Sequence, residues 1–164
     1  MSFITPIGFL DTTEFAARFV LQYREHMRSG ILELRSAEGD LPILAKWKTA
    51  ASLLKRLRNE ASILLKSRAE LGKAWLETVP GGHGTPWSID EDEYAQGHLR
   101  TRTCIIAAPD AYTHVGTEQV ILGPGIVNIV EHKVLHSETN LGSFPRTHLI
   151  VDVKVPEQEN EDGT

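Results

Sequence analysis

The spacing of apolar residues changes near residue 74, and this change limits what the chain can fold into. Before it, apolar side chains recur every three to four residues, as in residues 47–64. After it, glycine and proline separate short runs rich in β-branched residues, which is typical of strands in a sandwich or barrel. The sequence therefore predicts helices first and a β-rich body after them. The expected strands are residues 74–79, 101–108, 111–115, 118–122, 126–131 and 147–155.

The first 73 residues are expected to be mainly helical. Asp11 and Glu14 have the spacing of a capping box, which favours a helix start at that point. Residues 47–64 carry the apolar stripe of a second helix, and such a stripe is typical of a core-facing surface. Residues 3–10 predict a short strand, whereas residues 31–34 fit either a strand or a continued helix.

Length and composition are those of one ordinary domain. The chain has 164 residues, of which 41% are hydrophobic and 24% are charged. We expect a single domain over residues 1–155, with a helical part over 1–73, a β-sandwich core over 74–155 and a disordered acidic tail over 156–164. The sequence shows neither an apolar run that would span a bilayer nor a secretory signal, so the expected location is cytoplasmic.

The net charge of −5 is unevenly distributed along the chain. Residues 46–73 are basic, and a basic helix can meet nucleic acid, but it is more often the solvated face of an amphipathic helix. We therefore expect no nucleic-acid partner and no membrane partner. The single cysteine, Cys104, excludes an internal disulfide and a multi-cysteine zinc site, and its apolar run predicts a packed core thiol.

The chemistry-bearing residues cluster towards the end of the chain. His136 follows a strand-like run, and Arg146 follows ten residues later on another strand. An imidazole can hold a metal, and a guanidinium fork suits the carboxylate of a small diacid. His148 lies two residues after Arg146 and should share its side of the sheet. Arg100 and Arg102 likewise share a face, and burying both would be costly unless they meet anions.

Residues 136–153 read HSETNLGSFPRTHLIVDV. This stretch resembles the aspartyl/asparaginyl β-hydroxylase and proline-hydroxylase branch of the iron(II)- and 2-oxoglutarate-dependent oxygenases, through Asn140, the Pro145-Arg146 pair and the strand ending at 149–153. The resemblance covers about residues 74–155. It implies an α+β protein with a double-stranded β-helix, a cupin-like or jelly-roll-like sandwich, with the N-terminal helices packed on one sheet and the pocket inside.

The resemblance also implies iron(II) and a set of protein ligands for it. In the family, a His-x-Asp motif and a later histidine hold the metal on one face. The matching stretch here is Ser88-Ile89-Asp90. Asp90 and His136 are therefore the expected metal ligands, and Ser88 stands where the first histidine is usual.

The implied co-substrate is 2-oxoglutarate, whose far carboxylate needs a basic partner. Arg146 is the expected partner, and Arg100, Arg102 and His148 are expected to line the same binding site. Arg102 stands where the histidine of the family's Arg-x-His element is usual.

Ser88 is the main departure, because a neutral hydroxyl is a poor iron ligand. The sequence leaves three explanations open: His83 or His98 fills the gap, the site is inactive and retained as a scaffold, or Ser88 is an introduced substitution. The expected function is hydroxylation of an amino acid or of a side chain in a peptide or protein. The alternative is a cupin-like binding or scaffolding domain that has lost its metal.

Overall fold

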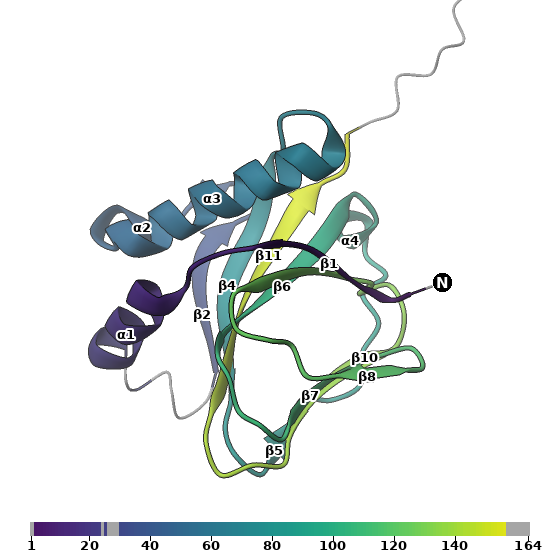
Figure 1. Ribbon diagram of the computed structural model, residues 1–164. Coiled ribbons are helices and arrows are strands. Elements are labelled where there is room, and N and C mark those ends of the chain that lie inside the picture. Colours follow the sequence, from purple (N-terminus) through teal and green to yellow (C-terminus); the bar gives the residue numbers. More distant parts are fainter. Residues whose placement is uncertain (1, 24, 26–29, 157–164) are drawn as a thin grey trace, which may run out of the picture.

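The fold is built from two antiparallel sheets that face each other (Figure 1). The computed structural model describes residues 2–23, 25 and 30–156, so the expected acidic tail lies outside the described residues except for Pro156. The larger sheet has the strand order β1 (Ile4–Phe9), β9 (Ile126–Val130), β6 (His98–Ile106), β11 (Arg146–Lys154), β4 (Leu71–Val79), β2 (Gly30–Ser36) and β3 (Gly39–Asp40). The smaller sheet has the order β5 (His83–Gly84), β10 (His136–Asn140), β7 (Ala111–Val115) and β8 (Glu118–Val120).

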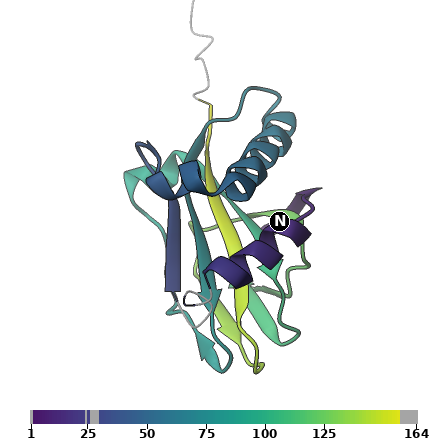
Figure 2. The same ribbon diagram turned by 90° about the vertical axis from the view of Figure 1, so that its left-hand side faces the viewer.

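Three helices lie on the face of the larger sheet that points away from the smaller one (Figures 1 and 2). They are α1 (Thr13–Gln22), α2 (Pro42–Lys46) and α3 (Lys48–Leu65), and a short α4 (Glu93–Gln96) precedes β6. Phe19 of α1 and Leu57 of α3 share one buried apolar cluster with Leu76 of β4 and Leu149 of β11. Trp47, between α2 and α3, belongs to the same cluster. This cluster is the main hydrophobic core.

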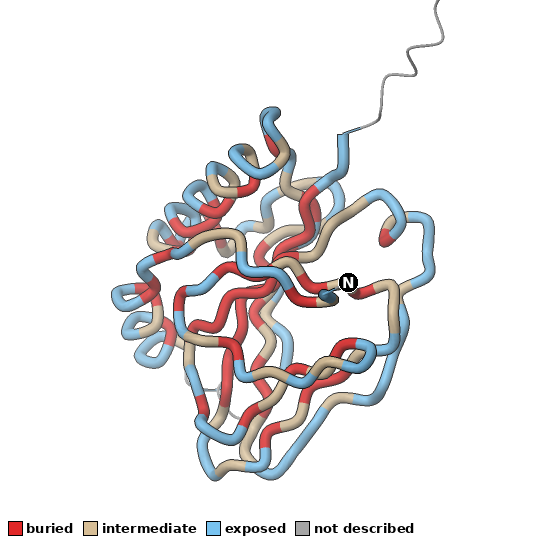
Figure 3. Tube along the Cα trace, turned by 45° about the vertical axis from the view of Figure 1, so that its right-hand side comes forward, coloured by how far each residue is buried: buried red, intermediate tan, exposed pale blue. Residues whose placement is uncertain are grey.

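Strand β11 divides its side chains between two environments. Its first eight residues are buried, as the colouring of Figure 3 also shows for the centre of the sheet. Leu149 and Val151 face the helices, whereas Arg146, His148 and Asp152 contact groups between the two sheets. Because side chains alternate along a strand, one strand supplies both an apolar core and a charged interior. Charge buried in this way needs partners.

The expected strands are confirmed, with shifts of at most three residues at their ends. Residues 31–34 form part of strand β2, so the first 73 residues contribute strands to the larger sheet as well as helices. The sequence did not indicate β10, a strand of mainly polar residues. The expected helix start is confirmed, because α1 begins at Thr13, but the capping box itself is wrong. Asp11 accepts a hydrogen bond from the Thr13 N–H at 3.1 Å, and Glu14 pairs with Arg18.

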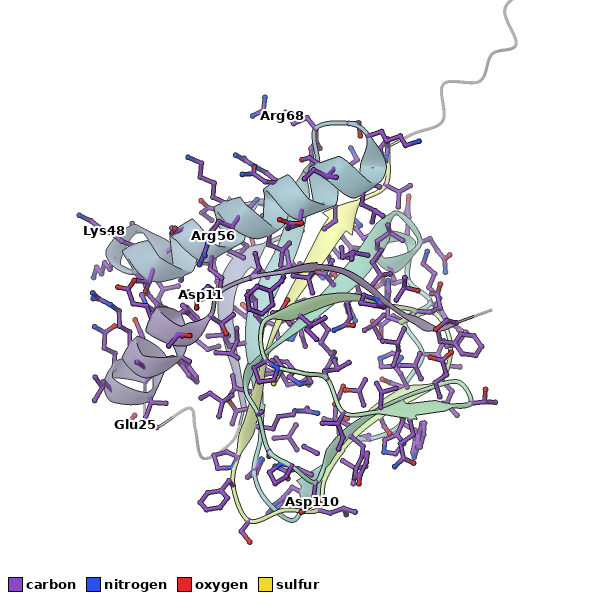
Figure 4. All side chains as sticks on the ribbon, in the orientation of Figure 1. Asp11, Glu25, Lys48, Arg56, Arg68 and Asp110 are labelled. Atoms are coloured by element: carbon purple, nitrogen blue, oxygen red, sulfur yellow. The ribbon has the colours of Figure 1, made fainter. Side chains whose placement is uncertain are left out.

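The basic stretch lies mostly on the outer face of α3. Lys48 and Arg68 project away from the sheet, and Arg56 lies beside Asp11, whose carbonyl accepts a 2.9 Å hydrogen bond from its guanidinium (Figure 4). Within the described residues, no helix combines the length and the apolar character needed to cross a membrane. Cys104 is buried as expected, and burial raises the pKa of its thiol to about 11.

Candidate active site

A pocket of about 430 Å³ opens between the two sheets. Its wall comes from the inner faces of β2, β4, β6 and β10 and from the segment 85–90. Ser88, Asp90, Arg100, Arg102 and His136 all line it, so the structure brings together residues that lie up to 48 positions apart in the chain. Arg146 and His148 do not line it.

His136 is held as a metal-binding histidine is usually held. Its backbone pairs with Ser88 through two hydrogen bonds of 2.9 and 3.0 Å, which fixes the two residues side by side. Its Nδ1 lies 2.9 Å from the carbonyl oxygen of Val134, which can only accept, so Nδ1 carries the hydrogen. Nε2 is then the acceptor of a 3.3 Å hydrogen bond that the Ser88 hydroxyl donates. An outer hydrogen bond of this kind orients a ligating imidazole.

Asp90 is an ionised carboxylate on the same wall. Burial alone would raise its pKa, but Arg100 and, to a smaller extent, His136 and His132 lower it more, so the pKa of Asp90 lies below its ordinary value. Arg100 forms an ion pair with Asp90 and holds Asp152 through two contacts of 2.8 and 3.1 Å. His132 Nδ1 lies 3.2 Å from Asp90 Oδ2. Asp90 is therefore already charged and already partnered.

The donors fit an iron(II) ion in part. An imidazole nitrogen and a carboxylate face one pocket, and Ser88 adds only a neutral hydroxyl. No set of three His, Cys, Asp or Glu side chains among the described residues could hold a metal ion. Of the three explanations that the sequence leaves open for Ser88, a third ligand from His83 or His98 therefore has no support among the described residues.

The positions of these two histidines explain this result. His83 is exposed and pairs with Asn140, four residues along β10 from His136, which corresponds to about 13 Å. The His98 ring stacks on Tyr94 at 3.9 Å and its Nδ1 bonds to the Tyr94 carbonyl. Asn140 donates hydrogen bonds to the carbonyls of Val79 and Phe144, so it braces the loop.

Arg146, the expected partner of the co-substrate, is paired with a carboxylate of the chain itself. Its Nη1 forms an ion pair with Glu138 Oε2. The same oxygen accepts from the Thr113 hydroxyl at 2.9 Å, and Glu138 Oε1 accepts from Arg102 Nη1 at 2.5 Å. Arg102 also contacts Glu77 at 3.1 Å. Glu138 thus joins two arginines in the interior.

Several donors in this cluster have no hydrogen-bond partner among the described residues. They are Nε and Nη2 of Arg146, Nε of Arg102 and Nε2 of His148. Burial, followed by the charges of Arg146 and Arg102, holds the pKa of His148 well below its usual range, so the ring is neutral. Its Nδ1 accepts from Arg102 Nη1 at 3.5 Å, so Nε2 carries the hydrogen. Unpaired buried donors are costly, and they suit an acceptor such as a carboxylate.

Glu138, Asp152, His132 and Trp75 are among the residues of the site that were not expected from the sequence. Two of them carried a usable signal, because Glu138 lies two residues after His136 and Asp152 shares the alternation of Arg146 and His148. Trp75 faces the pocket from β4, and the Arg100 guanidinium carbon lies over the Trp75 ring, 4.9 Å from the centre of that ring. His132 precedes β10, and no pattern in the sequence singles it out.

No protein-family model matches the chain, and no curated protein matches its sequence. Several solved structures are similar to the structure of this chain. A viral collagen prolyl hydroxylase from Paramecium Bursaria Chlorella virus-1, in complex with 2-oxoglutarate, is 11% identical with a TM-score of 0.60, over 94% of this chain and 97% of that one. An oxidoreductase of the 2-oxoglutarate–Fe(II) oxygenase family from Burkholderia pseudomallei is 14% identical with a TM-score of 0.60, over 90% and 81%.

AviO1 from Streptomyces viridochromogenes Tue57 is also similar, at 16% identity and a TM-score of 0.63 over 94% of this chain and 90% of that one. The chain has the fold of the 2-oxoglutarate–Fe(II) oxygenases. At these identities the likeness shows the fold alone, so the aspartyl/asparaginyl β-hydroxylase branch stays a prediction. The roles of Asp90, His136, Arg100, Arg102, Arg146 and His148 towards iron and 2-oxoglutarate also stay predictions.

Proposed function

We propose that this protein is an iron(II)- and 2-oxoglutarate-dependent dioxygenase that hydroxylates an unactivated carbon of an amino acid, free or within a peptide or protein. The observation that carries the proposal is the meeting of Ser88, Asp90 and His136 at one pocket of an oxygenase fold. These are the three positions that the sequence resemblance assigns to the metal. The similar viral prolyl hydroxylase, described as a 2-oxoglutarate complex, supports the choice of chemistry.

Each residue has a defined task in this proposal. His136 Nε2 and the Asp90 carboxylate would hold the iron, which together with 2-oxoglutarate and oxygen would supply the oxidant that replaces C–H by C–OH. The carbonyl of Val134 keeps the His136 lone pair directed into the pocket. Arg100 keeps Asp90 ionised. A volume of about 430 Å³ accommodates an amino-acid side chain beside Trp75.

A second function is favoured by two specific observations. Ser88 offers no charged or strongly basic donor, and the Asp90 carboxylate is already paired with Arg100. On this proposal the chain is a binding or scaffolding domain that keeps the oxygenase pocket for a small molecule or a peptide. Neither proposal involves nucleic acid or a membrane.

An anaerobic titration with iron(II) and 2-oxoglutarate separates the two functions through the visible charge-transfer band of the iron chelate. We would compare the natural chain with Ser88→His, which adds the missing imidazole, and with Ser88→Ala, which removes the hydroxyl. The dioxygenase proposal expects a band in the natural chain.

A band in Ser88→His alone would refute the dioxygenase function of the natural chain and support the binding domain. Absence of a band from all three proteins would overturn the assignment of Asp90 and His136 as ligands. Loss of the band in Ser88→Ala would show that the hydroxyl takes part in the site.

A further inference from the structure

We infer that Glu138 acts as a built-in competitor of acidic ligands: its carboxylate takes the place at Arg146 that the far carboxylate of a small diacid would need. Glu138 thereby determines which acids the pocket accepts. The inference rests on the proposed function only in taking 2-oxoglutarate as the natural acid. The competition itself is a property of the pocket and needs no metal.

The contacts of Glu138 are those of a carboxylate in a complete binding site. Its side chain is 5% exposed, and both oxygens are occupied. One oxygen meets Arg146 and Thr113, and the other meets Arg102. Two arginines and a hydroxyl converging on one carboxylate form the charge-assisted arrangement with which proteins recognise acidic ligands.

Glu138 also separates Arg146 from the pocket. Glu138 and Arg102 line the pocket wall, whereas Arg146 does not line it and is 2% exposed. Glu138 lies two residues after His136 on β10, so both side chains point to the same interior. An acid that enters beside His136 therefore meets the Glu138 carboxylate before it can reach Arg146.

The charge of the wall adds a second obstacle to a diacid. Four carboxylates line the pocket, from Glu33, Glu77, Asp90 and Glu138, against three basic side chains, from Lys73, Arg100 and Arg102. The unpaired Nε and Nη2 of Arg146 still lie next to the carboxylate of Glu138. Neutralising Glu138 should therefore leave the charge of Arg146 available to an external carboxylate and balance the charge of the wall, and removing the side chain should also clear the place beside Arg146.

The test is a calorimetric titration of metal-free protein with 2-oxoglutarate and with 2-oxobutanoate, which lacks the far carboxylate. Glu138→Gln should bind 2-oxoglutarate about tenfold or more tightly than the natural chain does, as expected for one additional charge-assisted hydrogen bond to the ligand. Its affinity for 2-oxobutanoate should stay within about threefold of that of the natural chain. The matched control is Glu77→Gln, which removes a carboxylate from the same wall and from Arg102 but leaves the pair with Arg146.

Equal affinity of the natural chain and Glu138→Gln for 2-oxoglutarate would overturn the inference, and so would an equal increase in affinity in Glu77→Gln. A second variant covers the case in which Glu138→Gln folds poorly. Glu138→Ala leaves a space beside Arg146 and Arg102 that acetate fits, so millimolar acetate should raise its melting temperature but not that of the natural chain. Failure of acetate to do so, with chloride as the control salt, would also refute the competition.

The outcome is separate from that of the iron titration. Tighter binding of 2-oxoglutarate by metal-free Glu138→Gln, together with no charge-transfer band in any variant, would refute the proposed function and leave this inference standing. A charge-transfer band in the natural chain, together with equal affinity of the natural chain and Glu138→Gln for 2-oxoglutarate, would support the proposed function and refute this inference.

Discussion

The pair of Arg100 and Asp152 gives the sharpest prediction for the stability of the sandwich interior. The Asp152 side chain is 0% exposed and both of its oxygens contact Arg100, at 2.8 and 3.1 Å. Asp152→Asn keeps the shape of the side chain and removes its charge. The amide oxygen can still accept a hydrogen bond from one N–H of the Arg100 guanidinium. The amide NH₂ would then face a second N–H of that guanidinium, and two donors cannot form a hydrogen bond with each other.

The size of the loss in unfolding free energy depends on which partners Arg100 retains in Asp152→Asn. Removing one partner of a buried ion pair costs about 3–5 kcal/mol, because the other charge is left without compensation. Arg100 retains Asp90 and one hydrogen bond to the new amide, so we expect the lower value, about 3 kcal/mol. For a domain of this length each kcal/mol lowers the melting temperature by about 2–4 °C, which gives a decrease of about 6–12 °C.

Thermal unfolding followed by circular dichroism at neutral pH measures this decrease. Asp90→Asn is the matched control, because Asp90 contacts the same guanidinium but its side chain is 28% exposed. It should cost about 1 kcal/mol or less, as partly exposed pairs do. A change below about 2 °C for Asp152→Asn, or a larger loss for Asp90→Asn, would refute the argument that burial of the pair sets its cost.

Two further predictions concern the core and the pH dependence. Leu57 lies on α3 and is 0% exposed, so Leu57→Ala should lower the free energy of unfolding by about 2–5 kcal/mol in urea titrations. Ile63 on the same helix is 73% exposed, and Ile63→Ala should change the free energy of unfolding by less than about 0.5 kcal/mol. Similar losses in the two variants would refute the packing of the Leu57 face of α3 against the sheet. Because the folded pKa of Asp90 lies below its ordinary value of 3.8, its contribution is present above that pH and is lost as the pH falls through the lower, folded value. The melting temperatures of the natural chain and Asp90→Asn should therefore converge as the pH falls from neutral to the acid limit. A difference between the two melting temperatures that stays constant with pH would contradict the lowered pKa of Asp90.

Much of the site could be predicted from residue spacing within single strands. Arg100 and Arg102 were expected to share a face, and both line the pocket. Arg146 and His148 were expected on one side of their strand, and both contact the cluster around Arg102. Side chains alternate between the two faces of a strand, and this depends only on neighbouring residues, so it can be predicted from the sequence.

The partners of these residues could not be predicted, because they depend on which strands face each other. Glu138 meets Arg146 and Arg102 only because β10 of the smaller sheet lies over β11 and β6 of the larger one. β10 itself was missed because its polar residues lack the apolar alternation that marks a half-buried strand. Two of its polar side chains, those of His136 and Glu138, line the pocket between the two sheets.

The place of β11 in the larger sheet has a consequence for how the protein is made. β11 is the final strand of the described chain, yet it lies between β6 and β4 and pairs with both. On the ribosome, β4 and β6 are complete before residues 146–154 emerge, and each then has an unpaired edge beside the missing centre. The nascent chain cannot close its larger sheet until that last strand arrives, so the edges of β4 and β6 are open to pairing with other chains until then.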